Sequence, residues 1–167
     1  MESNQSTQSK NIGTIIHLST FSKYIFPFGN FIFPLIFWMC NKKNFFVNEH
    51  GKECLNFQIS TFLYAICLVF ILIFGTLFFG ITWSDPEIIR ISDDFMSFQN
   101  FPELFPFFIF LGIVLLLLTA LFIFEIVCVI IAAVRASEGK TYNYPLNIRF
   151  IQTEQSKNEP FFKKQTV

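Results

Sequence analysis

One carboxylate, Glu125, lies inside a long apolar run that carries no other charge. An ionisable side chain within a membrane is a functional candidate by default, because burying it away from water is costly. If the run is helical, Glu125 lies about 15 Å from Arg135 along the helix, near mid-membrane depth. It could accept a proton, bind an ion or contact a basic residue of a partner. The alternative is a protonated carboxyl that is hydrogen-bonded inside a helix bundle, to Thr61, Tyr64 or a backbone group.

The densest group of polar side chains is the segment Asn48-Glu49-His50-Gly51-Lys52-Glu53. It offers one imidazole and two carboxylates, but it lacks the second histidine that a zinc protease helix requires four positions along. The sequence also contains no G-x-S-x-G elbow and no recognisable Ser, His and Asp arrangement. A membrane enzyme that acts on lipid is therefore disfavoured, and we predict that the protein is not an enzyme.

A structural role explains this segment more economically. We expect Asn48 to cap the next helix, the acidic residues to fill its first turn, and Asn56 and Gln58 to bond broken backbone of the hairpin. The alternative is a lipid-headgroup or partner site, and the residues that would form it are His50, Lys52, Lys42 and Lys43.

His17 and Asn30 are the remaining isolated polar candidates. A single histidine on an apolar segment is more often hydrogen-bonded at an interface than a ligand, and Asn30 beside Gly29 suits a turn. The four cysteines are scattered singly, with no C-x-x-C pair and no histidine at ligand spacing. We therefore expect no metal site, no cofactor and no small-molecule substrate.

Two long apolar runs must position these residues. The stretch from Leu55 to Ile81 has no charge, and the stretch from Phe107 to Val134 has only Glu125. Each exceeds the roughly 20 residues that cross the hydrocarbon core of a bilayer. With 53% apolar residues and 26 phenylalanines in 167 residues, the chain is predicted to be an all-α, multi-pass membrane protein. Twelve basic and twelve acidic residues cancel, so nothing in the net charge favours nucleic acid.

A third apolar stretch, residues 14–40, is interrupted by Pro27, Gly29 and Pro34. Proline removes a backbone donor and glycine tolerates the dihedral angles of a reversal, so we expect a hairpin of two half-helices. The alternative is one kinked span. Together with the two long spans, the hairpin predicts a four-helix bundle.

The charge pattern predicts how the chain is organised across the membrane. Basic residues precede the first long span and follow the second. By the positive-inside rule, both regions are expected on the cytoplasmic side of a bacterial inner membrane. The predicted parts are a flexible tail (1–11), one membrane domain (12–151) and a disordered tail (152–167). Within the domain we expect the hairpin 14–40, a span 55–81, an external loop 82–106, a span 107–135 and a cytoplasmic segment 136–151.

The predicted external loop is acidic. Its acids include Asp85, Glu87, Asp93 and Asp94, against the single base Arg90. Apolar side chains lie among these acids, so the loop could fold back onto the membrane surface as an amphipathic element or bind a partner.

Several segments, taken in order, resemble a known pattern. They are His17-Leu18-Ser19, Pro27-Phe28-Gly29-Asn30, Val47-Asn48-Glu49-His50-Gly51-Lys52-Glu53, Leu55-Asn56-Phe57-Gln58, Ile131 to Ala136, Gly139-Lys140, and Tyr144-Pro145-Leu146 to Arg149-Phe150. This order resembles a bacterial family of small membrane proteins related to the twenty-kilodalton inner-envelope component of chloroplast protein import. The resemblance implies a cytoplasmic signature that includes Arg135, Tyr144, Pro145 and Arg149. The long acidic loop and Glu125 depart from the pattern.

These observations lead to two functional hypotheses. The first is a non-enzymatic accessory or scaffold subunit of a larger membrane complex, linked to protein translocation or insertion and in contact with lipids and other membrane proteins. The second is a small oligomeric channel or proton-coupled transporter that uses Glu125 and His17. A single ionisable residue at mid-membrane depth in each chain argues against transport.

Overall fold

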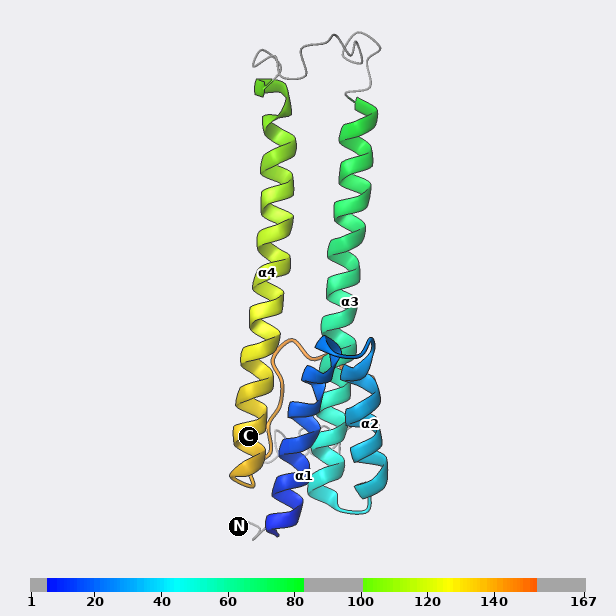
Figure 1. The fold of residues 1–167 in the computed structure, drawn as a ribbon, viewed down its shortest axis with the longest axis vertical. Helices are drawn as coiled ribbons and strands as arrows, with labels where there is room; N and C mark the ends of the chain where they lie inside the picture. The colour runs from blue at the N-terminus through cyan, green and yellow to red at the C-terminus, as the bar shows by residue number, and fades with distance from the viewer. Residues whose placement is uncertain (1–5, 83–100, 153–167) are drawn as a thin grey trace, which may run out of the picture. The chain divides into compact units, whose positions relative to one another are not determined.

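The computed structural model describes residues 6–82 and 101–152, and this part of the chain is helical apart from turns and one extended segment near its end. The elements are α1 (Thr7–Leu18), the 3-10 helix η1 (Ser19–Tyr24), α2 (Gly29–Asn41), α3 (Phe45–Thr82) and α4 (Phe101–Ser137). Figure 1 shows the short helices α1 and α2 beside the N-terminal part of α3. The prediction of an all-helical protein with an N-terminal hairpin and two long helices is confirmed.

The hairpin reverses between η1 and α2. Phe28 has a left-handed backbone, with φ of 62°, and it follows Pro27 directly. A β-carbon on Gly29 would lie 2.6 Å from Ser22 Oγ, so glycine is required there for close packing. The turn lies where Pro27 and Gly29 predicted it, although Phe28 adopts the unusual dihedral angle. At 13 residues, α2 extends about 20 Å, too short to cross a hydrocarbon core.

The helix α3 begins earlier than the apolar pattern predicted, and the segment 48–53 therefore lies within it. Asn44 Oδ1 accepts a hydrogen bond from the backbone N–H of Val47 at 3.3 Å, close to the start of the helix. The prediction that Asn48 is the cap is wrong, since Asn48 Oδ1 instead accepts a hydrogen bond from Trp38 Nε1 at 2.9 Å. This bond ties α3 to α2. At the N-terminus, α1 begins at Thr7, ahead of Ile12 where the domain was predicted to start.

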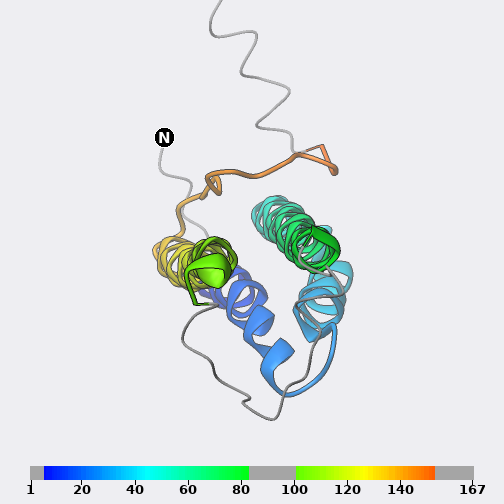
Figure 2. The same ribbon diagram turned by 90° about the horizontal axis from the view of Figure 1, so that it is seen from above.

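Contacts divide the chain into two compact units. Unit 1 contains residues up to Phe62 and from Phe124 onward, and unit 2 contains Leu63–Ile123. Unit 1 thus holds α1, η1, α2, the first part of α3 and the last part of α4, seen end-on in Figure 2. Its interior contains both apolar and polar side chains. The buried polar side chains are Ser9, His17, Thr20, Glu49, His50, Glu53, Asn56, Gln58, Ser60 and Thr61.

Unit 2 consists of the apolar remainder of α3 and α4. The Phe79 ring packs against Phe107 and Phe110, with ring centroids 5.8 and 5.6 Å apart. Gly75 faces the Phe110 ring so closely that a β-carbon would overlap it. Within this unit, aromatic packing joins the two helices.

Two helices in the described residues are long and apolar enough to cross a membrane, Phe45–Ile81 and Phe105–Ser137. None of the most apolar window of the first is buried inside the protein, and 17% of the second is. A core helix of a soluble protein would bury such a window. Apolar helices of this length with exposed surfaces are suited to lipid.

After α4 the chain turns and becomes extended. Gly139 has φ of 79°, and the N–H of Lys140 donates to the carbonyl oxygen of Arg135 at 3.0 Å. The predicted helix-ending turn at Gly139 is therefore confirmed. The extended segment then runs from the end of α4 toward α3 (Figures 1 and 2).

Candidate functional site

The centre of unit 1 is a chain of three hydrogen-bonding side chains from three separate elements. His17 of α1 lies between His50 of α3 and Tyr144 of the extended segment. His17 Nε2 is 2.8 Å from His50 Nδ1, and the Tyr144 hydroxyl is 2.8 Å from His17 Nδ1. All three side chains are buried. The chain therefore ties α1, α3 and the C-terminal segment together.

The protonation of this chain follows from its burial. Burial, reinforced by the neighbouring His50, holds the pKa of His17 well below its ordinary value of 6.5, so the ring is neutral. Burial likewise holds the pKa of Tyr144 well above 10.0, and its hydroxyl keeps its proton. A neutral imidazole donates through one nitrogen and accepts through the other. Protons along the three groups must therefore point in one common direction.

A pocket beside this chain is lined by Glu49, His50, Glu53, Thr141 and Tyr142. Asn147 Nδ2 donates to Glu53 Oε2 at 2.8 Å. The other carboxylate oxygen of Glu53 and Nε2 of His50 are buried, and neither has a hydrogen-bond partner among the residues that the structure describes. In the described residues, no group of three or more His, Cys, Asp or Glu side chains is arranged to hold a metal ion. The arrangement makes this a polar docking site for the C-terminal segment.

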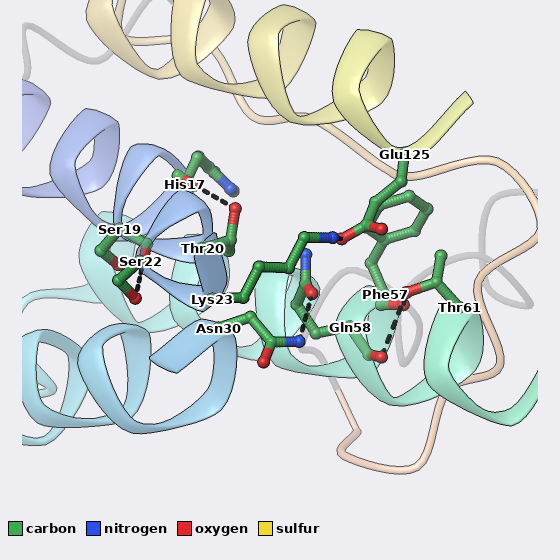
Figure 3. A network of polar contacts seen from close by, with 10 residues as sticks. All are labelled: His17, Ser19, Thr20, Ser22, Lys23, Asn30, Phe57, Gln58, Thr61 and Glu125. Carbon is green, nitrogen blue, oxygen red and sulfur yellow. Dashed lines mark hydrogen bonds and ion pairs between the residues drawn. The ribbon is translucent and has the colours of Figure 1, made fainter. Parts of the chain in front are cut away.

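Glu125 has a specific partner that the sequence analysis missed. Its Oε1 is 2.6 Å from Nζ of Lys23 in η1, and the two side chains are 13% and 23% exposed. Figure 3 shows this ion pair beside Asn30 and Gln58. The partner of Glu125 is thus the Lys23 ammonium group and not Thr61 or Tyr64, as predicted. Lys23 could have been found as the charged side chain inside the apolar stretch 14–40.

Asn30 and Gln58 support the same region. Asn30 Nδ2 of α2 donates to Gln58 Oε1 of α3 at 2.8 Å. The Thr61 hydroxyl donates to the carbonyl oxygens of Phe57 and Gln58, both at 3.1 Å. The prediction that Gln58 bonds broken backbone of the hairpin is wrong, because Gln58 Oε1 accepts a hydrogen bond from the side chain of Asn30.

Asn56 and Ser60 bond the backbone of the C-terminal segment instead of the hairpin. Asn56 Nδ2 donates to the carbonyl oxygen of Ile151, and Asn56 Oδ1 accepts from the N–H of Ile151, both at 2.8 Å. Ser60 Oγ accepts from the N–H of Ile148 at 2.8 Å. One polar stripe of α3 thus holds an extended chain.

The remaining predicted residues are dispersed. Lys52 lies 3.5 Å from Glu49 on the same helix, while Arg135, Pro145 and Arg149 are exposed. A headgroup site that combines His50 with Lys42 and Lys43 is not formed, since His50 is buried and the two lysines are exposed. The acidic residues Asp85, Glu87, Asp93 and Asp94 lie outside the described residues, as does the C-terminal tail beyond residue 152.

Comparison with known proteins changes the interpretation of the sequence. No curated protein and no solved structure matches the chain. A family model for magnetosome magnetite crystal formation proteins matches residues 8–151. This match covers nearly all of the described residues, and nothing supports the resemblance to the chloroplast import component. The hypothesis of protein translocation, which depended on that resemblance, is therefore wrong, and the alternative of a channel or transporter that uses Glu125 and His17 is not supported either. The chain belongs to the magnetosome magnetite crystal formation protein family.

Proposed function

We propose that this protein is a non-enzymatic membrane protein that promotes magnetite formation by presenting an acidic segment to iron at the membrane surface. The observation that carries the proposal is the placement of four acids in the sequence between α3 and α4. These are Asp85, Glu87, Asp93 and Asp94, with Arg90 as the single base among them. The segment joins the ends of the two helices that are long enough to cross a membrane.

Carboxylates suit this role chemically. Carboxylate oxygens are ligands for hard metal ions, and magnetite exposes iron at its surface. Four carboxylates on one short segment raise the local concentration of iron ions next to the membrane. The apolar helices keep the segment at the bilayer.

The charges at the other ends of the helices support an orientation. Lys42 and Lys43 precede α3, while Arg135 and Lys140 lie at the end of α4. By the positive-inside rule, we place both termini on the cytoplasmic side, with the acidic segment on the opposite side of a bacterial membrane. Lipids and other membrane proteins of the crystal-forming compartment are its expected partners.

The role of unit 1 in this proposal is to hold the two helices in register. The ion pair of Lys23 with Glu125 and the buried chain of His17, His50 and Tyr144 connect its elements. We assign these groups to stability rather than to chemistry, because each of them bonds another part of the same chain.

The test is mineral formation on liposomes that contain the protein, from a mixture of ferrous and ferric salts at fixed pH. The variant replaces Asp85, Glu87, Asp93 and Asp94 with their amides. The matched control neutralises four acids elsewhere, Glu2, Glu138, Glu154 and Glu159. We expect the wild type and the control to give the same crystal sizes by electron microscopy, and the loop variant to resemble empty liposomes. Equal crystals from the loop variant and the wild type would refute the proposal.

A further inference from the structure

The extended segment of residues 146–151, which we name the strap, has the backbone of Ile148 and Ile151 bonded to side chains of α3. Ser60 Oγ accepts from the N–H of Ile148, and Asn56 bonds both the N–H and the carbonyl of Ile151. Within the strap, the N–H of Phe150 donates to the carbonyl oxygen of Ile148 at 3.0 Å. Asn56 and Ser60 are fully buried, so α3 commits two interior polar side chains to this purpose.

The side chains of the strap point the other way. Leu146, Ile148 and Phe150 are 66%, 39% and 52% exposed, and they occupy every second position of the strap. Leu146 also has a left-handed backbone, with φ of 56°, a conformation that leucine rarely adopts. The strap therefore holds three apolar side chains outward at the expense of local strain.

This combination of backbone groups bonded to protein and apolar side chains turned outward is the opposite of what a loop in water usually shows. A loop in water leaves its backbone to be hydrated and turns polar side chains outward, because water bonds the N–H and C=O groups. In contact with hydrocarbon, each backbone polar group needs a partner from the protein, and the outward side chains must be apolar. The strap meets the first condition at Ile148 and Ile151, and the second at Leu146, Ile148 and Phe150.

The surroundings of the strap in unit 1 agree with a lipid-facing position. On α4, Ile130, Ile131 and Val134 are also exposed, so apolar surface continues at the end of the helix from which the strap emerges. Arg149 is exposed between Ile148 and Phe150. Its long side chain can extend to phosphate groups while its neighbours stay among acyl chains.

We propose that the strap is a lipid-contacting element, in which Leu146, Ile148 and Phe150 enter the acyl-chain region of the bilayer and Arg149 reaches a lipid phosphate. The partner is phospholipid, and the bonds from Asn56 and Ser60 replace the hydration that the backbone of Ile148 and Ile151 loses there. This contact is independent of the acidic segment and of the mineral.

The first test measures the surroundings of a spin label in liposomes. In a chain whose four cysteines are replaced by alanine, single labels are placed at Ile148→Cys and Phe150→Cys. Leu116→Cys, at a 66% exposed position of α4, is the control for lipid. Asn143→Cys, at an exposed position just before the strap, is the control for water. Collisions with oxygen report lipid, and collisions with a water-soluble nickel chelate report water.

We expect labels at residues 148 and 150 to collide with oxygen severalfold more than the Asn143 label does, and to be shielded from nickel as the Leu116 label is. Nickel accessibility equal to that of Asn143 would overturn the proposal. Shielding from both reagents, or spin–spin broadening that disappears on dilution with unlabelled protein, would also overturn it by showing that protein covers the strap.

A second variant guards against misfolding caused by the labels. Phe150→Trp keeps an aromatic ring, and Trp38→Phe with Trp83→Phe removes the native tryptophans. Fluorescence of the new tryptophan should be quenched by phospholipids brominated on their acyl chains, and not by iodide in the buffer. Quenching by iodide alone would refute lipid contact.

Discussion

The ion pair between Lys23 and Glu125 allows a quantitative prediction. The two charges are 2.6 Å apart, and their side chains are 23% and 13% exposed. At an effective dielectric constant of about 20, Coulomb's law gives an attraction of about 6 kcal/mol. Desolvation of both groups offsets much of it. Removing either charge leaves the other largely buried, so Glu125→Gln and Lys23→Met should each lower the free energy of unfolding by about 3 kcal/mol.

The double variant tests whether these effects have one origin. It should lose no more than about 3 kcal/mol, far less than the roughly 6 kcal/mol that independent effects would give, because no unpaired buried charge remains. The assay is reversible unfolding in mixed detergent micelles, followed by circular dichroism. The control cycle uses Glu138 and Lys140, 2.9 Å apart but 46% and 53% exposed, for which we expect no measurable coupling. Additive losses for the Lys23 and Glu125 variants would refute the reasoning.

Three further predictions concern unit 1. The pKa of His17 is lower in the folded protein than in the unfolded chain, so the unfolded chain binds the proton first as the pH falls. The stability that neutral His17 contributes is present above about pH 6.5 and is lost as the pH falls below it. In the His17→Gln variant, the melting temperature should therefore depend less on pH. Asn56→Ala removes two hydrogen bonds to the strap and should lower the free energy of unfolding by about 1–3 kcal/mol. Hydrogen exchange in the strap, measured by mass spectrometry, should become faster. Unchanged exchange would contradict the role given to Asn56. Gly51→Ala should be strongly destabilising, because a β-carbon there overlaps Trp38. Its control, Gly80→Ala, meets open space and should raise the helix melting temperature slightly by propensity.

Much of the fold could be predicted from local chemistry. Apolar length indicated the two long helices, and Pro27 with Gly29 indicated the hairpin turn. The start of α3 was misplaced because the pattern of apolar residues marks only where a helix meets lipid. The polar first turns of α3 are helical as well, and their side chains are buried by α1, α2 and the C-terminal segment rather than by lipid.

The site was harder to predict, because its contacts join residues far apart in sequence. His17, His50 and Tyr144 were each singled out, but nothing in their local sequence indicates that they meet. Lys23 and Glu125 are about a hundred residues apart, and only the rule that a buried charge requires a partner could have joined them. The family resemblance was wrong for a different reason: it depended on a few short motifs, whereas the family model matches residues 8–151 as a whole.

The bonds between α3 and the strap have a consequence for biosynthesis. Asn56 and Ser60 are made early, whereas their partners Ile148 and Ile151 are made about ninety residues later. Because chains emerge from the ribosome N-terminus first, α3 must enter the membrane with this polar stripe still without its backbone partners. Water or the insertion machinery has to occupy the stripe until the strap arrives. Ribosome-bound chains that end before residue 145 should therefore have an α3 stripe open to solvent, and translation of the strap is the step that closes unit 1.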